Sequence, residues 1–240
     1  MRILFKITSR SRPEKFLTTL KSIVDNLSEK CDPLLLISID DDDKEKDRYI
    51  ELFQKLDEEK ELPEAIIRVG PSDNKIFAIN RDIAHTRDMQ WDILVNVSDD
   101  QIFTKKDFDK DIVQSFASVT GEAYTQYDWD RFIHFPDWYV NDKLPTMAIM
   151  GRPYYNRFGY VYHPDYISLW CDNEQMDVAK SMGKYFYVDN HIFRHEHPAN
   201  VRGLPQDELL KYNQSFYHYD GETYRKRKAA GFPKECIVNL

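Results

Sequence analysis

Apolar residues recur along the N-terminal half of the chain with two different periods, and the two alternate. Nearly continuous apolar runs at 2–7, 34–39, 65–69 and 91–97 are typical of strands buried on both faces of a parallel sheet. Between the runs, apolar residues recur at helical spacing, most clearly in a helix that we expect to begin at Pro13. Strands that alternate with helices predict a doubly wound, largely parallel α/β sheet.

The C-terminal half is less regular. We expect a helix over 106–119, and we interpret the aromatic-rich stretch 120–165 as loops and short strands, with strands at 147–150 and 158–162. Three more elements are expected after it: a helix that begins near Cys171, a strand over 185–188 and a mostly helical, charged segment over 204–240.

Composition and charge narrow the class of protein. The chain has 240 residues, of which 42% are hydrophobic, enough to build the core of one large domain or two small ones. Its net charge of −8 argues against nucleic acid as the main partner, because binding to phosphates needs a basic face.

The cysteines and the N-terminus predict a cytoplasmic protein. Cys31, Cys171 and Cys236 are odd in number and far apart, which favours reduced thiols over disulfides or a zinc site. The first strand lacks the basic region and long apolar region of a signal peptide. No apolar run approaches the length of about 18 residues that a membrane span needs, so we expect no transmembrane segment.

Acidic residues follow two of the predicted strands. The run 40–43 is four aspartates, and Asp99 and Asp100 come after the strand at 91–97. In a parallel sheet these strand ends meet at the crevice where ligands bind. Carboxylates there suit a hard cation, and such a cation suits phosphate. The loop 8–12 adds two arginines and two hydroxyls that can meet an anion. The alternative is that these stretches are ordinary solvated turns.

Two later stretches also carry polar groups suited to chemistry. Asp172 lies near the start of a predicted helix, where capping that helix is the alternative to a chemical role. His195 and His197 point to the same side of an extended segment. The basic run 225–228 suits weak peripheral contact with an anionic membrane surface, or else it is a solvated helix end.

In their order along the chain, these stretches resemble the GT-A glycosyltransferases, and among them the large inverting family two. The resemblance covers roughly residues 1–200. Its motifs are Ile7–Glu14, Asp40 after a strand, Asn74-Lys75 with Asn80, Val97–Asp100, Asp172–Glu174 and His195–Pro198.

This resemblance implies the GT-A (Rossmann-like) fold, a mixed and mostly parallel sheet flanked by helices, with a helical C-terminal extension. By this reading residues 1–203 form the catalytic domain, in which 1–105 bind the nucleotide and 106–203 bind the acceptor. Residues 204–240 are then the extension.

The resemblance further implies a metal-dependent inverting transfer from a nucleotide-diphosphate sugar, with a UDP-sugar expected, to a hydroxyl of a glycan, a lipid-linked or another acceptor. The expected cofactor is Mn²⁺ or Mg²⁺, held by Asp100 with His195 or His197. Asp172 matches the catalytic base, and Glu174 is the alternative base or an acceptor ligand. The implied nucleotide-binding residues are Thr8, Ser9, Arg10, Asp40, Asp42, Lys75, Asn80, Ser98 and Asp99.

The chain departs from the family's DxD motif at its first position, which is Ser98. Serine can hydrogen-bond a ribose but is a poorer metal ligand, so either fewer acids hold the metal or Asp99 shares the role. Two rival functions follow. One is a non-catalytic GT-A-like module that binds a sugar or a partner, with Ser98 as a sign of decay. The other is a nucleotidyltransferase, ranked lower because no glycine-rich triphosphate loop follows the first strand.

Overall fold

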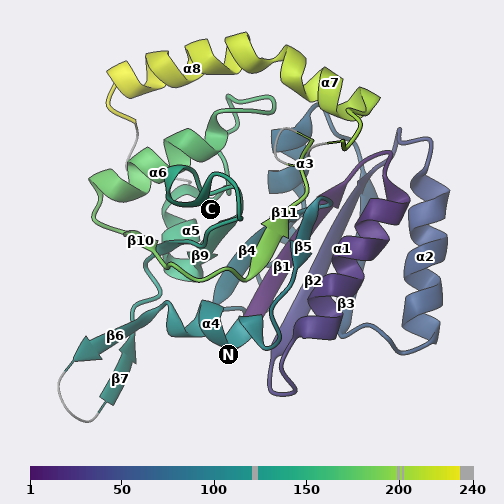
Figure 1. Ribbon diagram of the computed structural model, residues 1–240, viewed down its shortest axis with the longest axis horizontal. Coiled ribbons are helices and arrows are strands. Elements are labelled where there is room, and N and C mark those ends of the chain that lie inside the picture. The colour runs from purple at the N-terminus through teal and green to yellow at the C-terminus, as the bar shows by residue number, and fades with distance from the viewer. Residues whose placement is uncertain (121–123, 199–200, 202, 233–240) are drawn as a thin grey trace.

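A seven-stranded sheet lies at the centre of the protein, in the strand order β10-β8-β9-β4-β1-β2-β3 (Figure 1). The computed structural model describes residues 1–120, 124–198, 201 and 203–232. The strands of the sheet are β1 (Arg2–Ser9), β2 (Asp32–Asp40), β3 (Glu64–Gly70), β4 (Ile93–Ser98), β8 (Phe132–His134), β9 (Ala148–Gly151) and β10 (Tyr185–Tyr187).

The four N-terminal strands run parallel, as their continuous apolar runs predict. Leu4 of β1 lies between Leu34 of β2 and Leu94 of β4, and β3 extends the same register beyond β2. Because the four strands point the same way, the loops after Ser9, Asp40, Gly70 and Ser98 gather at one edge. Strand β9 then runs antiparallel to both β4 and β8. The sheet is therefore mixed and mostly parallel, as the GT-A resemblance implies.

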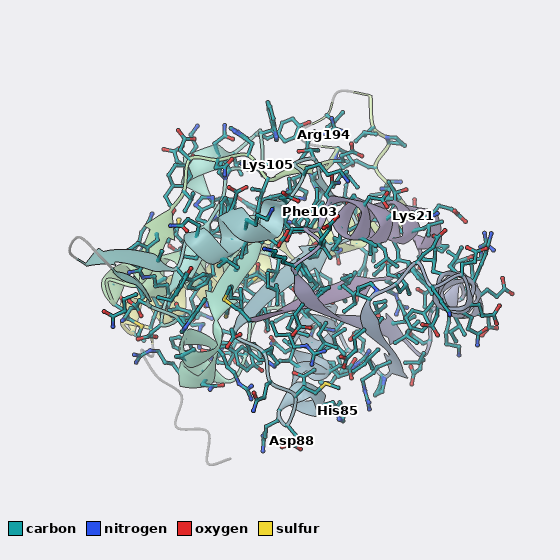
Figure 2. All side chains as sticks on the ribbon, turned by 90° about the horizontal axis from the view of Figure 1, so that it is seen from below. Lys21, His85, Asp88, Phe103, Lys105 and Arg194 are labelled. Carbon is teal, nitrogen blue, oxygen red and sulfur yellow. The ribbon has the colours of Figure 1, made fainter. Side chains whose placement is uncertain are left out.

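Alternate residues of the central strands point to opposite faces of the sheet and bury two separate apolar clusters. Phe5 and its neighbours pack under α1 (Pro13–Asn26), α2 (Lys46–Glu58), α4 (Phe108–Gln114) and the small antiparallel pair β5 (Gln101–Phe103) and β11 (Phe193–His195). In Figure 2, Lys21, Phe103 and Arg194 lie on this side, and His85 and Asp88 lie on the other. The sheet is thus covered on both faces.

The second face is covered by segments from distant parts of the chain. Leu4, Leu34 and Leu36 pack there against apolar side chains of the covering helices. Those helices are α3 (Lys75–Arg81), the 3-10 turn η1 (Ile83–Thr86), α5 (Arg152–Phe158) and α6 (Cys171–Ser181). This layer places the start of α6 beside the carboxyl ends of the parallel strands.

Two expectations for the C-terminal half are wrong. The helix expected over 106–119 ends at Gln114, and the chain turns into the hairpin β6 (Ala117–Thr120) and β7 (Tyr124–Tyr127). The strand expected at 158–162 is instead the end of α5 and the turn after it. Gly159 closes that helix in the left-handed conformation, with φ 72°, where glycine has no Cβ penalty.

The remaining elements are the 3-10 turn η2 (Asn141–Lys143) and the helices α7 (Glu208–Ser215) and α8 (Tyr217–Ala229). Figure 1 shows α7 and α8 lying one after the other across one side of the molecule. They confirm a helical C-terminal extension, whose last described helix ends at Ala229, and residues 233–240 lie outside the described part. Within the described part, no helix combines the length and apolar character needed to cross a membrane.

Candidate functional site

A cavity of about 1030 Å³ opens at the carboxyl edge of β1, β2 and β4, and the helix α7 forms its far wall. Its volume lies at the upper end of the range usual for small-molecule sites. Every candidate residue from the sequence except Asn80 and Glu174 lines this cavity. Those that do are Thr8, Ser9, Arg10, Asp40, Asp42, Lys75, Ser98, Asp99, Asp100, Asp172, His195 and His197.

Arg10 joins two aspartates of the acidic run at one end of the cavity. Its Nη1 donates to Asp40 Oδ2 at 2.9 Å, and its Nη2 donates to Asp42 Oδ2 at 3.0 Å. Asp40 is buried, and burial raises its pKa although Arg10 pulls it down. Asp43 is also buried, but it accepts the backbone N–H of Ser11 and so fixes the loop. The acidic run is therefore built into the site and is not simply a solvated turn.

Asp99, the middle position of the DxD-like motif, has both carboxylate oxygens hydrogen-bonded to other side chains of the protein. Its Oδ2 accepts from Ser9 Oγ at 2.6 Å, and its Oδ1 accepts from Arg12 Nη1 at 3.1 Å. Burial, followed by the charge of Asp100, raises the pKa of Asp99 to about 6. Because both oxygens already have donors, Asp99 fixes the β1–α1 loop against β4.

Asp100 lies between the sheet and β11 and faces His195. Its Oδ1 is 3.4 Å from His195 Nε2, and within the described residues it is buried without a hydrogen bond. On the other side of the imidazole, Asp137 Oδ2 is 3.5 Å from His195 Nδ1. Burial alone would lower the pKa of His195, but the two carboxylates outweigh it and raise that pKa to about 9. The arrangement therefore favours a positive charge at this point.

The donor set fits a divalent cation that takes further ligands from a substrate. No group of three or more histidine, cysteine or acidic side chains in the described residues is arranged to hold a metal alone. Mg²⁺ sites, however, commonly use one or two carboxylates and complete the shell with phosphate oxygens and water. The buried Oδ1 of Asp100 is a suitable ligand, and so is the Nε2 of His195 once a bound cation has displaced its proton. Asp137 would orient the imidazole through its Nδ1 side. The His197 ring centroid lies 5.6 Å from that of His195.

Asp172 occupies the first turn of α6 and faces the same cavity. The helix begins at Cys171, its cap position is Trp170, and no side chain caps it, so the capping alternative for Asp172 is wrong. Burial raises the pKa of Asp172, while the neighbouring charge of Lys75 pulls it down. Lys75 acts in the same direction on the pKa of Asp100. The lysine therefore lies near both carboxylates.

The two remaining candidates lie outside the cavity and support its walls. Glu174 is buried and receives both Nε and Nη2 of Arg227 at 2.8 Å, together with the hydroxyl of Tyr166 at 2.7 Å. Both polar atoms of the Asn80 side chain also have partners. Its Nδ2 donates to the carbonyl of Tyr162, and its Oδ1 accepts the backbone N–H of Val161. Neither side chain is placed to meet a substrate, so Glu174 as a base or acceptor ligand and Asn80 as a nucleotide ligand do not agree with this geometry.

The basic run at 225–228, which we expected either to contact a membrane or to be solvated, forms ion pairs with α6. Arg227 pairs with Glu174, and Lys228 pairs with Asp177 at 2.7 Å. Two of its four cations thus hold α8 against α6, which removes much of the charge that would favour contact with an anionic membrane.

Sequence reasoning missed three parts of the site. Arg12 appeared only as one cation of a loop, yet it joins Asp99 to Asp207 at the start of α7. Asp137 lies in an aromatic-rich stretch that shows neither helical nor strand periodicity. Its pairing with His195 could not be predicted, because the two residues are far apart in the sequence. The wall formed by α7 lay in a segment that we expected only to be helical. No spacing in the chain indicates any of these long-range contacts.

No family model and no curated protein matches the sequence. Solved structures do resemble the fold. A mannosyltransferase from Pyrobaculum calidifontis, solved with GDP-Man and Mn²⁺, matches 98% of this chain with a TM-score of 0.62 and 11% identity. This chain spans 65% of that protein's length.

Two further structures resemble the fold over most of both chains. Glucosyl-3-phosphoglycerate synthase from Mycobacterium tuberculosis, solved with Mg²⁺ and UDP, matches 96% of this chain and 80% of its own, with a TM-score of 0.52 and 14% identity. 4-Diphosphocytidyl-2C-methyl-D-erythritol synthase from Anaerococcus prevotii matches 90% and 96%, with a TM-score of 0.50 and 12% identity. At such low identities the likeness concerns the fold alone, and the chain has the GT-A fold.

Proposed function

We propose that the protein is a metal-dependent, inverting glycosyltransferase that uses a nucleotide-diphosphate sugar. The observation that carries the proposal is the set of side chains that line this cavity. A half-buried carboxylate, Asp172, shares it with the Asp100–His195 pair, and the charge of Lys75 acts on both acids. A proton acceptor, a cation site and a phosphate-binding cation are the groups that such a transfer needs.

The nucleotide end of the cavity is assigned to the loops after β1 and β2. Thr8, Arg10, Asp40 and Asp42 line it beside Ser98. The solved complexes of similar fold hold GDP-Man in one case and UDP in the other. We assign a UDP-sugar as the donor of this chain, and a GDP-sugar is the competing outcome of the test below.

Asp100 and His195 would hold the metal ion, with His197 beside them. When bound, the ion supplies Lewis-acid stabilisation of the charge that develops on the leaving diphosphate. Lys75 adds a second positive charge close to Asp100 and so favours the same anion. Asp137 holds the His195 imidazole in orientation through its Nδ1 side.

Asp172 would take the proton of the acceptor hydroxyl. An uncharged hydroxyl is a weak nucleophile, so a positioned carboxylate must accept its proton as the attack proceeds. Burial raises the pKa of Asp172, which makes it a stronger base than an exposed aspartate. Attack from the side opposite the diphosphate inverts the anomeric centre.

The test is to incubate the protein with UDP-sugars and GDP-sugars, with and without Mn²⁺, and to measure nucleotide release and nucleotide binding. We expect metal-stimulated release of UDP. In the variant Asp100→Ala, the metal-dependent part of nucleotide binding should be lost. If the protein neither releases nor binds UDP or GDP, the proposal fails.

A nucleotidyltransferase is the second candidate, because the Anaerococcus prevotii synthase shares this fold over most of both chains. That reaction would consume a nucleoside triphosphate and release pyrophosphate. Release of pyrophosphate from CTP or UTP, with no nucleotide release from sugar nucleotides, would replace the first proposal. A non-catalytic module would bind a glycan without needing metal or nucleotide, and calorimetry with each ligand separates the three.

A further inference from the structure

We infer that the acceptor is a neutral glycan and that its subsite is the polar, aromatic face of α7 together with the start of α8. The inference rests on the proposed function and names the substrate that would bind along the wall of the cavity formed by α7. Tyr212, Asn213, Gln214 and Tyr217 form this face, and all four line the cavity. We call this set the α7 face.

Charge is distributed unevenly around the cavity. The cations that line it are Arg10, Arg12 and Lys75, and all three come from the donor loops. The part of the lining that α7 and the start of α8 supply contains no lysine, arginine or histidine, and its acid is Glu208. Arg12 reaches the start of α7 but is already paired with Asp207 and Asp99. A phosphorylated acceptor along this wall would therefore meet Glu208 without a free cation from the wall to balance it. The distribution therefore favours a neutral acceptor.

The chemistry of the α7 face suits a ligand with many hydroxyls and an apolar ring face. Tyr212 is 56% exposed and Tyr217 is 52% exposed, so both rings offer free aromatic surface with a polar tip. Asn213 and Gln214 supply amide donors and acceptors, which can pair with hydroxyls of either polarity. A sugar ring presents C–H groups to an aromatic face and hydroxyls to amides.

Both tyrosine rings are held in place by a second aromatic ring. Tyr212 packs edge-to-face on Phe216 with centroids 5.1 Å apart, and Tyr217 packs on Trp170 with centroids 5.4 Å apart. The helices that carry them are fixed to the body of the fold. The buried carboxylate of Asp220 accepts the backbone N–H of Ile167, Ser168 and Leu169. Binding here would therefore order few side chains, which lowers its entropic cost.

The experiment measures glycan binding to the full chain with saturating UDP and Mn²⁺. The probes are an array of neutral oligosaccharides, with calorimetry for the strongest binder, and 3-phosphoglycerate as the anionic probe. We expect a neutral oligosaccharide to bind and Tyr212→Ala or Tyr217→Ala to weaken it about tenfold. The matched control is Tyr219→Ala, because Tyr219 is 57% exposed on the same helical segment but does not line the cavity.

A second variant and a second readout keep the outcomes separate. Tyr217→Phe keeps the ring and should retain most of the affinity, which covers the case in which Tyr217→Ala does not fold. Preference for 3-phosphoglycerate, an array without a binder, or equal binding by the alanine variants would overturn the inference. UDP affinity is measured in the same samples. If UDP fails to bind while a glycan binds through the tyrosines, the proposed function fails and the subsite stands.

Discussion

Residues 1–105, which we propose bind the donor, are called the donor half. The described residues from 106 onward, which we propose bind the acceptor together with the C-terminal helices, are called the acceptor half, and the two halves are built in opposite ways. Strands β1 to β4 and their helices follow one another in the chain. The pairs β1–β2 and β2–β3 are each joined through one helix, and β4 then pairs with β1 on its other side. The acceptor half depends on a reversed strand, β9, and on helices whose side chains meet partners more than 50 residues away, as Arg227 meets Glu174. The first half is encoded by local periodicity, and the second by tertiary contacts.

The polar groups differ in the same way. Around the donor loops, Arg10 binds Asp40 and Asp42, and Arg12 binds Asp99, so the charged groups at these strand ends are paired within the protein. At the acceptor end, Asp172 and the α7 face point into the cavity with few polar partners from the protein. The comparison indicates a donor end whose charged groups are paired with one another and an acceptor end whose polar groups are left for the substrate.

The largest effect on this comparison is expected from Asp172→Asn. Loss of the proposed base should lower kcat by about 10²- to 10⁴-fold, because general-base catalysis contributes that much, while UDP affinity stays nearly unchanged. Steady-state kinetics and calorimetry of UDP binding measure the two quantities. A parallel loss of UDP affinity would mean that Asp172 belongs to the donor half.

The pH dependence of kcat sharpens the same test. Burial raises the pKa of Asp172, so its carboxylate becomes protonated at a higher pH than that of an exposed aspartate. The rate should therefore fall as pH drops through that raised pKa. An acid limb at the pKa of an ordinary exposed aspartate would contradict the assignment.

Glu174→Gln should produce the largest loss of stability. Glu174 is buried and receives two donors of Arg227, and breaking such a buried pair from one side costs about 3–5 kcal/mol of unfolding free energy. The control in the donor half is Glu14→Gln, which removes a surface pair to Arg48 and should leave the free energy of unfolding nearly unchanged. Urea denaturation measures both. Equal losses would show that long-range pairs do not hold the acceptor half.

The sequence predicted the donor half in detail, because continuous apolar runs and helical spacing are local signals. Asp40, Asp99 and Asp100 could be placed at one edge from strand direction alone. The same reasoning failed at 158–162, where Phe158, Tyr160 and Tyr162 have the composition of a strand but Gly159 is needed to end a helix. It also assigned chemistry to Glu174, because nothing local shows that Arg227 neutralises it. Long-range pairing is therefore the information that a single sequence lacks.

Lys75→Met tests whether the charge of the donor half reaches the substrate. Lys75 lines the cavity and lies near both Asp100 and Asp172. Removal of a cation that contacts a diphosphate should weaken binding of the donor about 10- to 100-fold, since a hydrogen bond to a charged group contributes about 1.5–3 kcal/mol. Lys21→Met, on α1 and away from the cavity, is the control (Figure 2). A loss confined to kcat would assign Lys75 to the chemical step.

The smallest effect is expected where the two halves are joined. Asp207 accepts Nε and Nη2 of Arg12 and also caps α7 by accepting the backbone N–H of Leu210. Asp207→Ala removes both contacts and should cost about 1–2 kcal/mol, whereas Asp207→Ser keeps a cap and should cost less. Hydrogen exchange of the amides of α7 measures the local change. Because Arg12 also binds Asp99, a loose α7 should leave Arg12 on Asp99 and the UDP affinity intact. If UDP affinity falls together with α7 protection, the donor half is not preorganised by itself but depends on the acceptor half to hold Arg12 in place.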